Sequence, residues 1–284
     1  MGTQPRELRQ AIAAMGQALG PDVLRSVQAL FGPEQDAMAG MPANADIPYG
    51  THPRQTLDLY RPAQPAAPAP VLLWVHGGGF VRGEKRAPNH PFNAHVGRWA
   101  ARNGMIGAVM EYRLVPDAQW PSGGEDVGLA VQWLRAHIAD HGGDPDRIIL
   151  MGTSAGAVHI ATLLKLDGQA GGAQAAVLLS GLYGFTPLDE RDTLYYGAHG
   201  CYDERMPRDA VIGASIPLFV VCAQYDPPRF QAETLGLLHA MLEHDTMPRA
   251  MIVSGHNHFS LACHLGGADT RLADEVIAFI RDQR

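Results

Sequence analysis

The chain has 284 residues, of which 46% are hydrophobic and 18% charged, so it can form a sizeable core and is not expected to be disordered. Its formal net charge of -7, with scattered Lys and Arg, argues against nucleic acid as a partner. No stretch approaches the ~20 apolar residues of a membrane span, and the N-terminal residues lack the apolar region of a signal peptide. We therefore expect a cytoplasmic protein, with no membrane partner, that acts on a small molecule.

Residues 1–45 predict an N-terminal helical cap of two short helices, because apolar residues recur at helical spacing and Gly-Pro pairs interrupt them. Residues 54–62 then alternate like a half-buried strand. After these, strands that are apolar on both faces alternate with helices. The strands are expected at 71–76, 105–112, 147–152, 176–181, 217–225 and 249–255, and the helices at 89–102, 123–141, 155–166, 230–243 and 269–284.

This alternation predicts an α/β fold with a doubly wound, mostly parallel sheet, in which ligands bind beyond the carboxyl ends of the strands. One domain over residues 1–284 is expected, because α/β enzymes of this length commonly form a single unit. Residues 185–215 fit neither pattern, and we expect them to form a small cap insertion over the site. The three cysteines, Cys201, Cys222 and Cys263, are widely spaced, which indicates free thiols in a reducing compartment.

A G-x-S-x-G motif, Gly152-Thr153-Ser154-Ala155-Gly156, stands between a predicted apolar strand and a predicted helix. This context is typical of a nucleophile elbow, where a serine occupies a sharp turn and the residues two positions away must be small. The alternative is an ordinary turn in which the serine caps the helix. The flanking strand and helix favour Ser154 as a nucleophile.

A second motif follows the first buried strand, as His76-Gly77-Gly78-Gly79-Phe80. Three consecutive glycines allow the backbone to approach a ligand closely and direct N–H groups at it, as an oxyanion hole requires. Gly78, Gly79 and Ala155 are the expected donors. A flexible loop is the alternative, and His76 is expected to support the loop by hydrogen bonding or to pack at the strand end.

The two motifs together resemble the hormone-sensitive-lipase-like branch of the α/β-hydrolase esterases, and the resemblance spans residues 55–278. A third segment resembles the same branch through Tyr112, Arg113, Leu114, Pro116, Pro121, Glu125 and Asp126. The sequence departs from the branch at Thr153, where Asp or Glu is usual, and in its shorter cap. Kynurenine formamidases and small bacterial carboxylesterases share these departures.

A serine nucleophile needs a base and an acid that orients the base, and in this fold they follow in the order Ser, Asp or Glu, His. Asp226 ends the strand 217–225 and is the expected acid, although it could instead cap the next helix. Asp189, Asp192 and Asp203 are weaker substitutes. The resemblance favours His258 as the base, because a His-Phe pair commonly precedes the last helix, and His256 is the fallback.

Two other groups of residues are not expected to take part in catalysis or metal binding as a group. Glu125 and Asp126 precede the serine, so by chain order they are expected to open or cap the helix 127–141. His256, His258 and His264 could suggest a metal site, but the spacing gives no clear third ligand, so no metal is predicted.

The sequence therefore predicts a serine carboxylesterase that needs no cofactor and acts on small, short-acyl esters. An arylformamidase with the same triad is the alternative, and Trp120, Phe185, Tyr195 and Tyr196 lie in segments expected to line its pocket. A non-catalytic ligand-binding protein of the same fold is a third hypothesis, disfavoured by the complete triad. The resemblance also points to the final helix as the contact surface of a homodimer.

Overall fold

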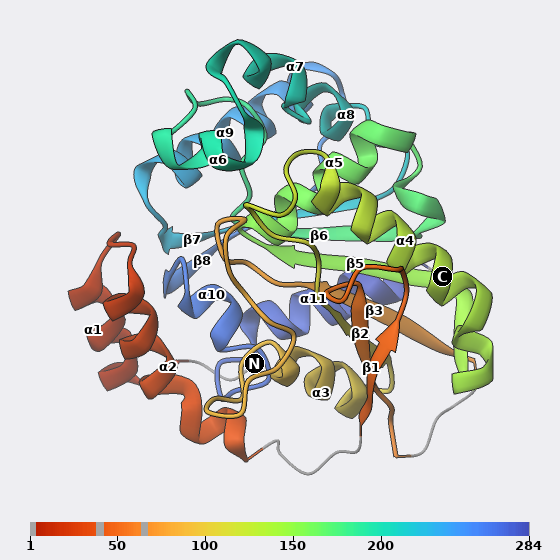
Figure 1. Ribbon diagram of the computed structural model, residues 1–284. Coiled ribbons are helices and arrows are strands. Elements are labelled where there is room, and N and C mark those ends of the chain that lie inside the picture. The colour runs from red at the N-terminus through yellow and green to blue at the C-terminus, as the bar shows by residue number, and fades with distance from the viewer. Residues whose placement is uncertain (1–3, 38–42, 64–67, 284) are drawn as a thin grey trace.

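The computed structural model describes residues 4–37, 43–63 and 68–283 (Figure 1). The strands are β1 Ala43–Pro48, β2 Thr56–Tyr60, β3 Ala69–Val75, β4 Ile106–Met110, β5 Gly143–Thr153, β6 Ala175–Leu179, β7 Leu218–Tyr225 and β8 Arg249–Asn257. The longer helices are α1 Arg6–Met15, α2 Pro21–Asp36, α3 Ala94–Arg102, α4 Ser122–His137, α5 Ala155–Asp167, α9 Pro228–Glu243 and α11 Arg271–Asp282. Short helices are α6 Thr193–Tyr196, α7 Tyr202–Arg205, α8 Arg208–Ile212 and α10 Ser260–Cys263.

The strands form one sheet in the order β1-β2-β4-β3-β5-β6-β7-β8. β2 pairs antiparallel with β1 and β4, and the pairs from β4 through β8 are parallel. This confirms the doubly wound, mostly parallel sheet. Because β5, β7 and β8 run in the same direction, the residues that follow them emerge at one edge of the sheet.

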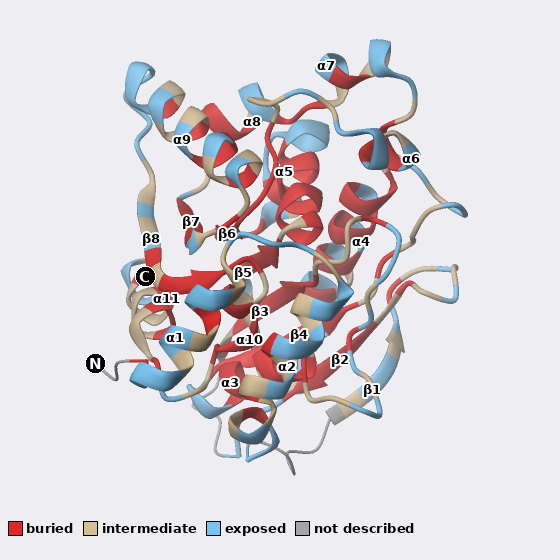
Figure 2. Cartoon of the chain, turned by 90° about the vertical axis from the view of Figure 1, so that its left-hand side faces the viewer, coloured by how far each residue is buried: buried red, intermediate tan, exposed pale blue. Residues whose placement is uncertain are grey.

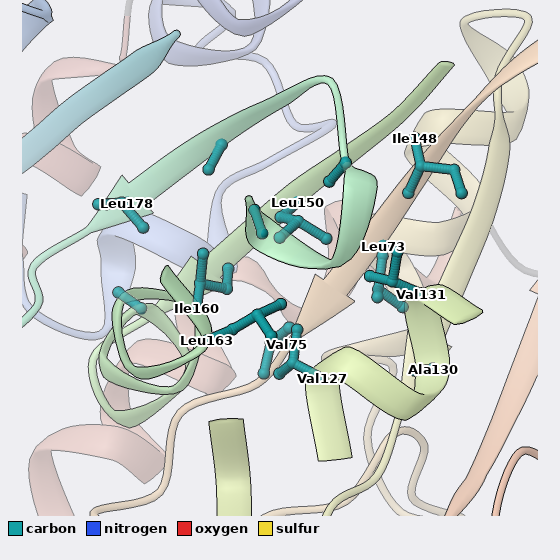
Figure 3. Packing of buried hydrophobic residues seen from close by; sticks show 14 of the residues in the cluster. Leu73, Val75, Val127, Ala130, Val131, Ile148, Leu150, Ile160, Leu163 and Leu178 are labelled. Atoms are coloured by element: carbon teal, nitrogen blue, oxygen red, sulfur yellow. The ribbon is translucent and has the colours of Figure 1, made fainter. Parts of the chain in front are cut away.

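Both faces of the sheet are buried at its central strands, which explains why β3, β4 and β6 are apolar at nearly every position (Figure 2). Leu73 and Val75 of β3 face a core beneath α4 and α5, which Figure 3 shows from close by. Leu72 and Trp74, the alternate residues of the same strand, pack on the opposite face against α3 and α11. The central strands are therefore held by apolar packing on both sides.

Of the two N-terminal helices, α1 lies beside β8 and α2 lies beside α10 (Figure 1). Ile12 of α1, Phe31 of α2 and Cys263 belong to one small buried core. Tyr225 and Phe259 pack against this core. Tyr225 directly precedes Asp226, and Phe259 directly follows His258. The predicted pair of helices thus supports the two loops that carry the predicted acid and base.

Some predicted boundaries were wrong. Residues 43–45 belong to β1, which pairs with β2, and no strand had been expected there. The helix expected from residue 89 begins at Ala94, because Asn93 has the left-handed φ of 65° and interrupts a helical path. Residues 185–215 contain short helices α6, α7 and α8 above the sheet edge (Figure 1).

The three cysteines are free, as expected. Burial raises the pKa of the Cys222 thiol to about 11 and that of Cys263 to about 12, so both are inert thiols at neutral pH. Among the described residues, every helix is too short or too polar to span a membrane.

Candidate active site

Ser154 lies at the turn between β5 and α5 with φ 53° and ψ -120°. This left-handed φ is uncommon for a residue with a side chain and marks the strained turn expected of a nucleophile elbow. Ser154 is at the N-cap position of α5, yet its side chain makes no cap hydrogen bond to that described helix. The capping alternative was therefore wrong.

The motif glycines are required by close backbone packing around this turn. A Cβ atom on Gly156 would lie 2.0 Å from the carbonyl oxygen of Val75, on the neighbouring strand β3. A Cβ atom on Gly152 would lie 2.6 Å from the carbonyl carbon of Gly156. Any side chain at either position would displace the turn, so the steric explanation of the motif holds.

The glycine loop after β3 lies directly against the elbow. A Cβ atom on Gly77 would be 3.3 Å from Cβ of Ser154, which measures how closely the two segments approach. Gly78 and Gly79 have φ of 143° and 60°, and a Cβ atom on Gly78 would lie 1.8 Å from the carbonyl oxygen of Arg82. The loop therefore depends on glycine for its conformation as well as for its closeness to Ser154.

His76 supports this loop through both hydrogen bonding and packing. Its Nδ1 lies 2.7 Å from the carbonyl oxygen of Gly77, and its own carbonyl oxygen accepts a 2.8 Å hydrogen bond from the hydroxyl of Tyr112. The two rings stack with their centroids 4.4 Å apart. Burial lowers the pKa of His76 to about 4, so its ring is neutral at pH 7.

Asp226 and His258, which follow β7 and β8, are in direct contact. Nδ1 of His258 lies 2.7 Å from Oδ1 of Asp226, and both residues are buried. An ionised carboxylate only accepts hydrogen bonds, so Nδ1 carries the proton and Nε2 is left as the basic nitrogen. Asp226 makes no cap hydrogen bond to the described helix α9, so its capping alternative was wrong.

The other oxygen of Asp226 is held by donors that the sequence analysis did not single out. Oδ2 accepts 2.6 Å hydrogen bonds from the hydroxyl of Ser180 and from the backbone N–H of Ala223. Ser180 is fully buried at the end of β6 and has φ 48°. Its place at the carboxyl end of an apolar strand was the available signal, the same one that identified Asp226.

His256 is engaged elsewhere and does not face Asp226. Its Nε2 lies 3.1 Å from Oδ2 of Asp269, its Nδ1 lies 3.1 Å from the hydroxyl of Ser260, and its ring stacks on His264 at 3.9 Å. His258 points to a different carboxylate, so the three histidines do not converge. No metal-binding group of three or more His, Cys, Asp or Glu occurs in residues 4–37, 43–63 and 68–283.

Glu125 lies in the first turn of α4 and Asp126 follows it, so the pair stands at the start of this helix as expected, but Asp126 makes no cap hydrogen bond to the described helix. It is buried within the first turns of α4, which begins at Ser122. Its carboxylate accepts hydrogen bonds from the backbone N–H and guanidinium of Arg113 and from the amide of Gln55. Asp126 therefore joins the segment after β4 to the segment before β2.

Ala155, the residue after Ser154, belongs to a buried cluster that contains several aromatic side chains. Phe80 stacks on Tyr195 with ring centroids 4.3 Å apart, and both belong to this cluster. Phe230 of α9 is in the same cluster, and its ring centroid lies 4.3 Å from that of His258. The cluster thus joins the elbow, the glycine loop and His258. Its buried members are Phe80, Ala155, Val158, Leu182, Tyr195, Tyr196, Tyr202, Met206 and Phe230.

Comparison with known proteins identifies relatives among esterases. Residues 57–178 match the family model described as BD-FAE. The "Probable carboxylic ester hydrolase LipM" of Mycobacterium tuberculosis is 34% identical, covering 64% of this chain and 47% of LipM. The "Esterase LipQ" of the same organism is 30% identical, covering 77% of this chain and 58% of LipQ. This chain therefore spans about half the length of these relatives.

Solved structures share the fold over the whole chain. The thermophilic carboxylesterase EstE1, cloned from a metagenomic library, superposes with a TM-score of 0.68 at 24% identity, covering 94% of this chain and 98% of EstE1. At this identity the likeness concerns the fold alone.

Proposed function

We propose that this chain, which has the α/β-hydrolase fold and sequence relatives among carboxylic ester hydrolases, hydrolyses carboxylic esters. Ser154 is the nucleophile, His258 the base, and Asp226 the acid that orients His258. The substrate is a small ester with a short acyl group. The reaction requires no cofactor.

The observation that carries this proposal is the 2.7 Å contact between Asp226 and His258 at the same sheet edge as the strained turn of Ser154. The contact fixes the imidazole tautomer in which Nε2 accepts a proton. A serine hydroxyl is a weak nucleophile unless such a base removes its proton during attack. The arrangement therefore supports nucleophilic catalysis better than simple ligand binding.

The backbone N–H groups of Gly78, Gly79 and Ala155 are the proposed oxyanion hole. Gly77 abuts Ser154, and Ala155 begins α5, so the donors and the nucleophile belong to adjoining backbone segments. Preorganised donors stabilise negative charge as it develops on the carbonyl oxygen. The loss of one such donor typically costs about 2.7–4 kcal/mol of transition-state stabilisation.

The proposed reaction has two steps. Ser154 Oγ bonds to the ester carbonyl carbon as His258 Nε2 takes its proton; the C–O bond then breaks and His258 returns the proton to the leaving alcohol. Water next attacks the acyl-enzyme, giving its proton to His258, and the acid leaves as Ser154 regains that proton. Asp226 stays ionised and stabilises the imidazolium in both steps.

The preference for short acyl groups rests on the residues around Ala155. Phe80, Tyr195 and Tyr196 are 1–3% exposed, so they pack tightly beside the elbow instead of lining a wide, open channel. Longer acyl chains would have to displace these rings, which lose packing energy when they move.

The proposal is tested with p-nitrophenyl acetate, butyrate and octanoate, using wild type and Ser154→Ala. We expect turnover of the short esters to fall by at least about 10³-fold in the variant, because the nucleophile is lost. A fluorophosphonate should label wild type but not the variant.

N-formylkynurenine is assayed alongside as the control for reaction class. If it were cut while all three esters were left intact, the protein would be an arylformamidase. If neither were cut and no label attached to Ser154, the assignment of the nucleophile would be wrong.

A further inference from the structure

A buried carboxylate on α9 holds the start of the 185–215 insertion. Glu233 is 0% exposed, and its oxygens accept hydrogen bonds of 2.6–3.2 Å from the backbone N–H groups of Tyr183, Gly184, Phe185 and Thr186. The hydroxyl of Thr186 donates to it as well. A buried carboxylate is tolerated only where donors compensate it, and here one backbone segment provides them.

One turn earlier on α9, Arg229 fixes the next part of the insertion. Its Nε donates to the hydroxyl of Thr186 at 3.1 Å, and its guanidinium lies 2.5 Å from Oδ2 of Asp192. Asp192 is 1% exposed and the Arg229 side chain 19%, so this ion pair is largely shielded from water. Tyr202 adds a hydrogen bond from its hydroxyl to the carbonyl oxygen of Thr186 at 3.3 Å.

Asp192 immediately precedes α6, which carries Tyr195 and Tyr196. Tyr195 stacks on Phe80 at 4.3 Å, and Tyr196 contacts the same ring edge-on at 5.6 Å. The position of Asp192 therefore determines the position of both tyrosines relative to Phe80.

The same turn of α9 is tied to the acid and base. The helix begins two residues after Asp226, and the ring of Phe230 lies against His258. One short piece of α9 thus contacts both parts of the site. Arg229 and Glu233 hold the insertion, and Phe230 contacts His258. Movement of the insertion relative to the base is opposed by a buried ion pair and several charge-assisted hydrogen bonds.

We propose that Arg229 and Glu233 are positioning residues that hold residues 183–196 as a fixed wall against Phe80, and that this wall limits the size of the ester that reaches Ser154. The limit on size rests on the proposed esterase function. The fixed position of the wall does not, and it can be measured without substrate.

The kinetic test compares wild type with Arg229→Gln and Asp192→Asn on p-nitrophenyl acetate and octanoate. We expect the ratio of kcat/KM for octanoate to that for acetate to rise about tenfold, because a released wall admits the longer chain. Arg229→Lys should give an intermediate ratio, since an ammonium keeps the charge but cannot contact Thr186 and Asp192 in fork geometry. A second series of acetates with larger alcohols shows whether the alcohol side is limited instead.

Asp209→Asn is the matched control, because Asp209 also pairs with an arginine in the insertion but is highly exposed. It should leave both series unchanged. Equal losses for small and large esters in the Arg229 and Asp192 variants would overturn the proposal.

Hydrogen exchange provides the measurement that is independent of catalysis. In wild type the amides of 183–197 should exchange slowly, and in Arg229→Gln and Arg229→Lys they should exchange faster while 208–213 stay unchanged. Unchanged protection of 183–197 would overturn the fixed wall. If exchange responds as expected but wild type cleaves no ester, the wall stands and only the proposed esterase function fails.

Discussion

The carboxylate of Asp226 receives donors on both of its oxygens, and Ser180 supplies one of them. Replacing Ser180 with Ala removes a hydrogen bond to a charged group, which is worth about 1.5–3 kcal/mol. If that energy serves to hold Asp226 against His258, we expect kcat on p-nitrophenyl acetate to fall about tenfold to hundredfold with KM little changed.

Comparing Ser180→Gly with Ser180→Ala separates the effect of losing the hydrogen bond from the effect of backbone strain at this residue. Ser180 has φ 48°, so glycine relieves a strain that alanine retains. The two variants should lose the same activity, while thermal unfolding should show the glycine variant to be the more stable. Full kcat in both would mean that Ala223 N–H alone suffices to hold Asp226.

The candidate catalytic residues could be predicted from the sequence because each follows an apolar strand. Ser154, Asp226 and His258 each come directly after, or at the end of, an apolar strand, and strand ends in a parallel sheet meet at one edge. Glu233 could not be assigned in the same way. It lies on the buried face of α9 with Phe230 and Leu237, and only the tertiary fold brings residues 183–186 to its carboxylate.

At the scale of elements, the contact between α3 and β4 depends on two glycines, Gly97 of α3 and Gly107 of β4. A Cβ atom on Gly97 of α3 would lie 2.3 Å from the ring of Tyr60 and 2.8 Å from Val109. We expect Gly97→Ala to lower the free energy of unfolding by about 1–3 kcal/mol, because overpacking forces the helix away from the sheet. Urea unfolding monitored by circular dichroism measures this change.

Gly200→Ala is the control for the removal of a glycine. A Cβ atom there would meet nothing within 4 Å, so stability should change by no more than about 0.5 kcal/mol or rise slightly. If both variants were equally stable, α3 would not be held as closely to β4 as these distances indicate.

Elements with a strong apolar pattern were predicted well, and those fixed by pairing were not. β3, β4, β6 and β7 are buried on both faces along almost their whole length, so their composition alone identified them. β1 is an edge strand whose residues are mostly exposed or half-buried, and it exists because it pairs with β2. Such a strand has little periodicity to predict it.

At the scale of the whole molecule, buried histidines lie on both sides of the sheet. Burial lowers the pKa of His76 and His95 to about 4 and that of His159 and His264 to about 3. All four are neutral in the folded protein at pH 7, whereas an unfolded histidine titrates near pH 6.5. Below that pH the unfolded chain therefore binds more protons than the folded chain.

This difference makes stability fall as the pH falls from about 6.5 toward 4, by up to about 1.4 kcal/mol per pH unit for each buried histidine. The free energy of unfolding in urea should therefore be several kcal/mol lower at pH 5.0 than at pH 7.5. His95→Gln removes one titrating ring, while its amide can still donate to the carbonyl oxygen of Ala262, so the pH dependence should become shallower. His239→Gln, at an exposed position on α9, should leave it unchanged. A free energy that stayed constant down to pH 5.0 would mean that these rings accept protons without unfolding, contrary to their full burial.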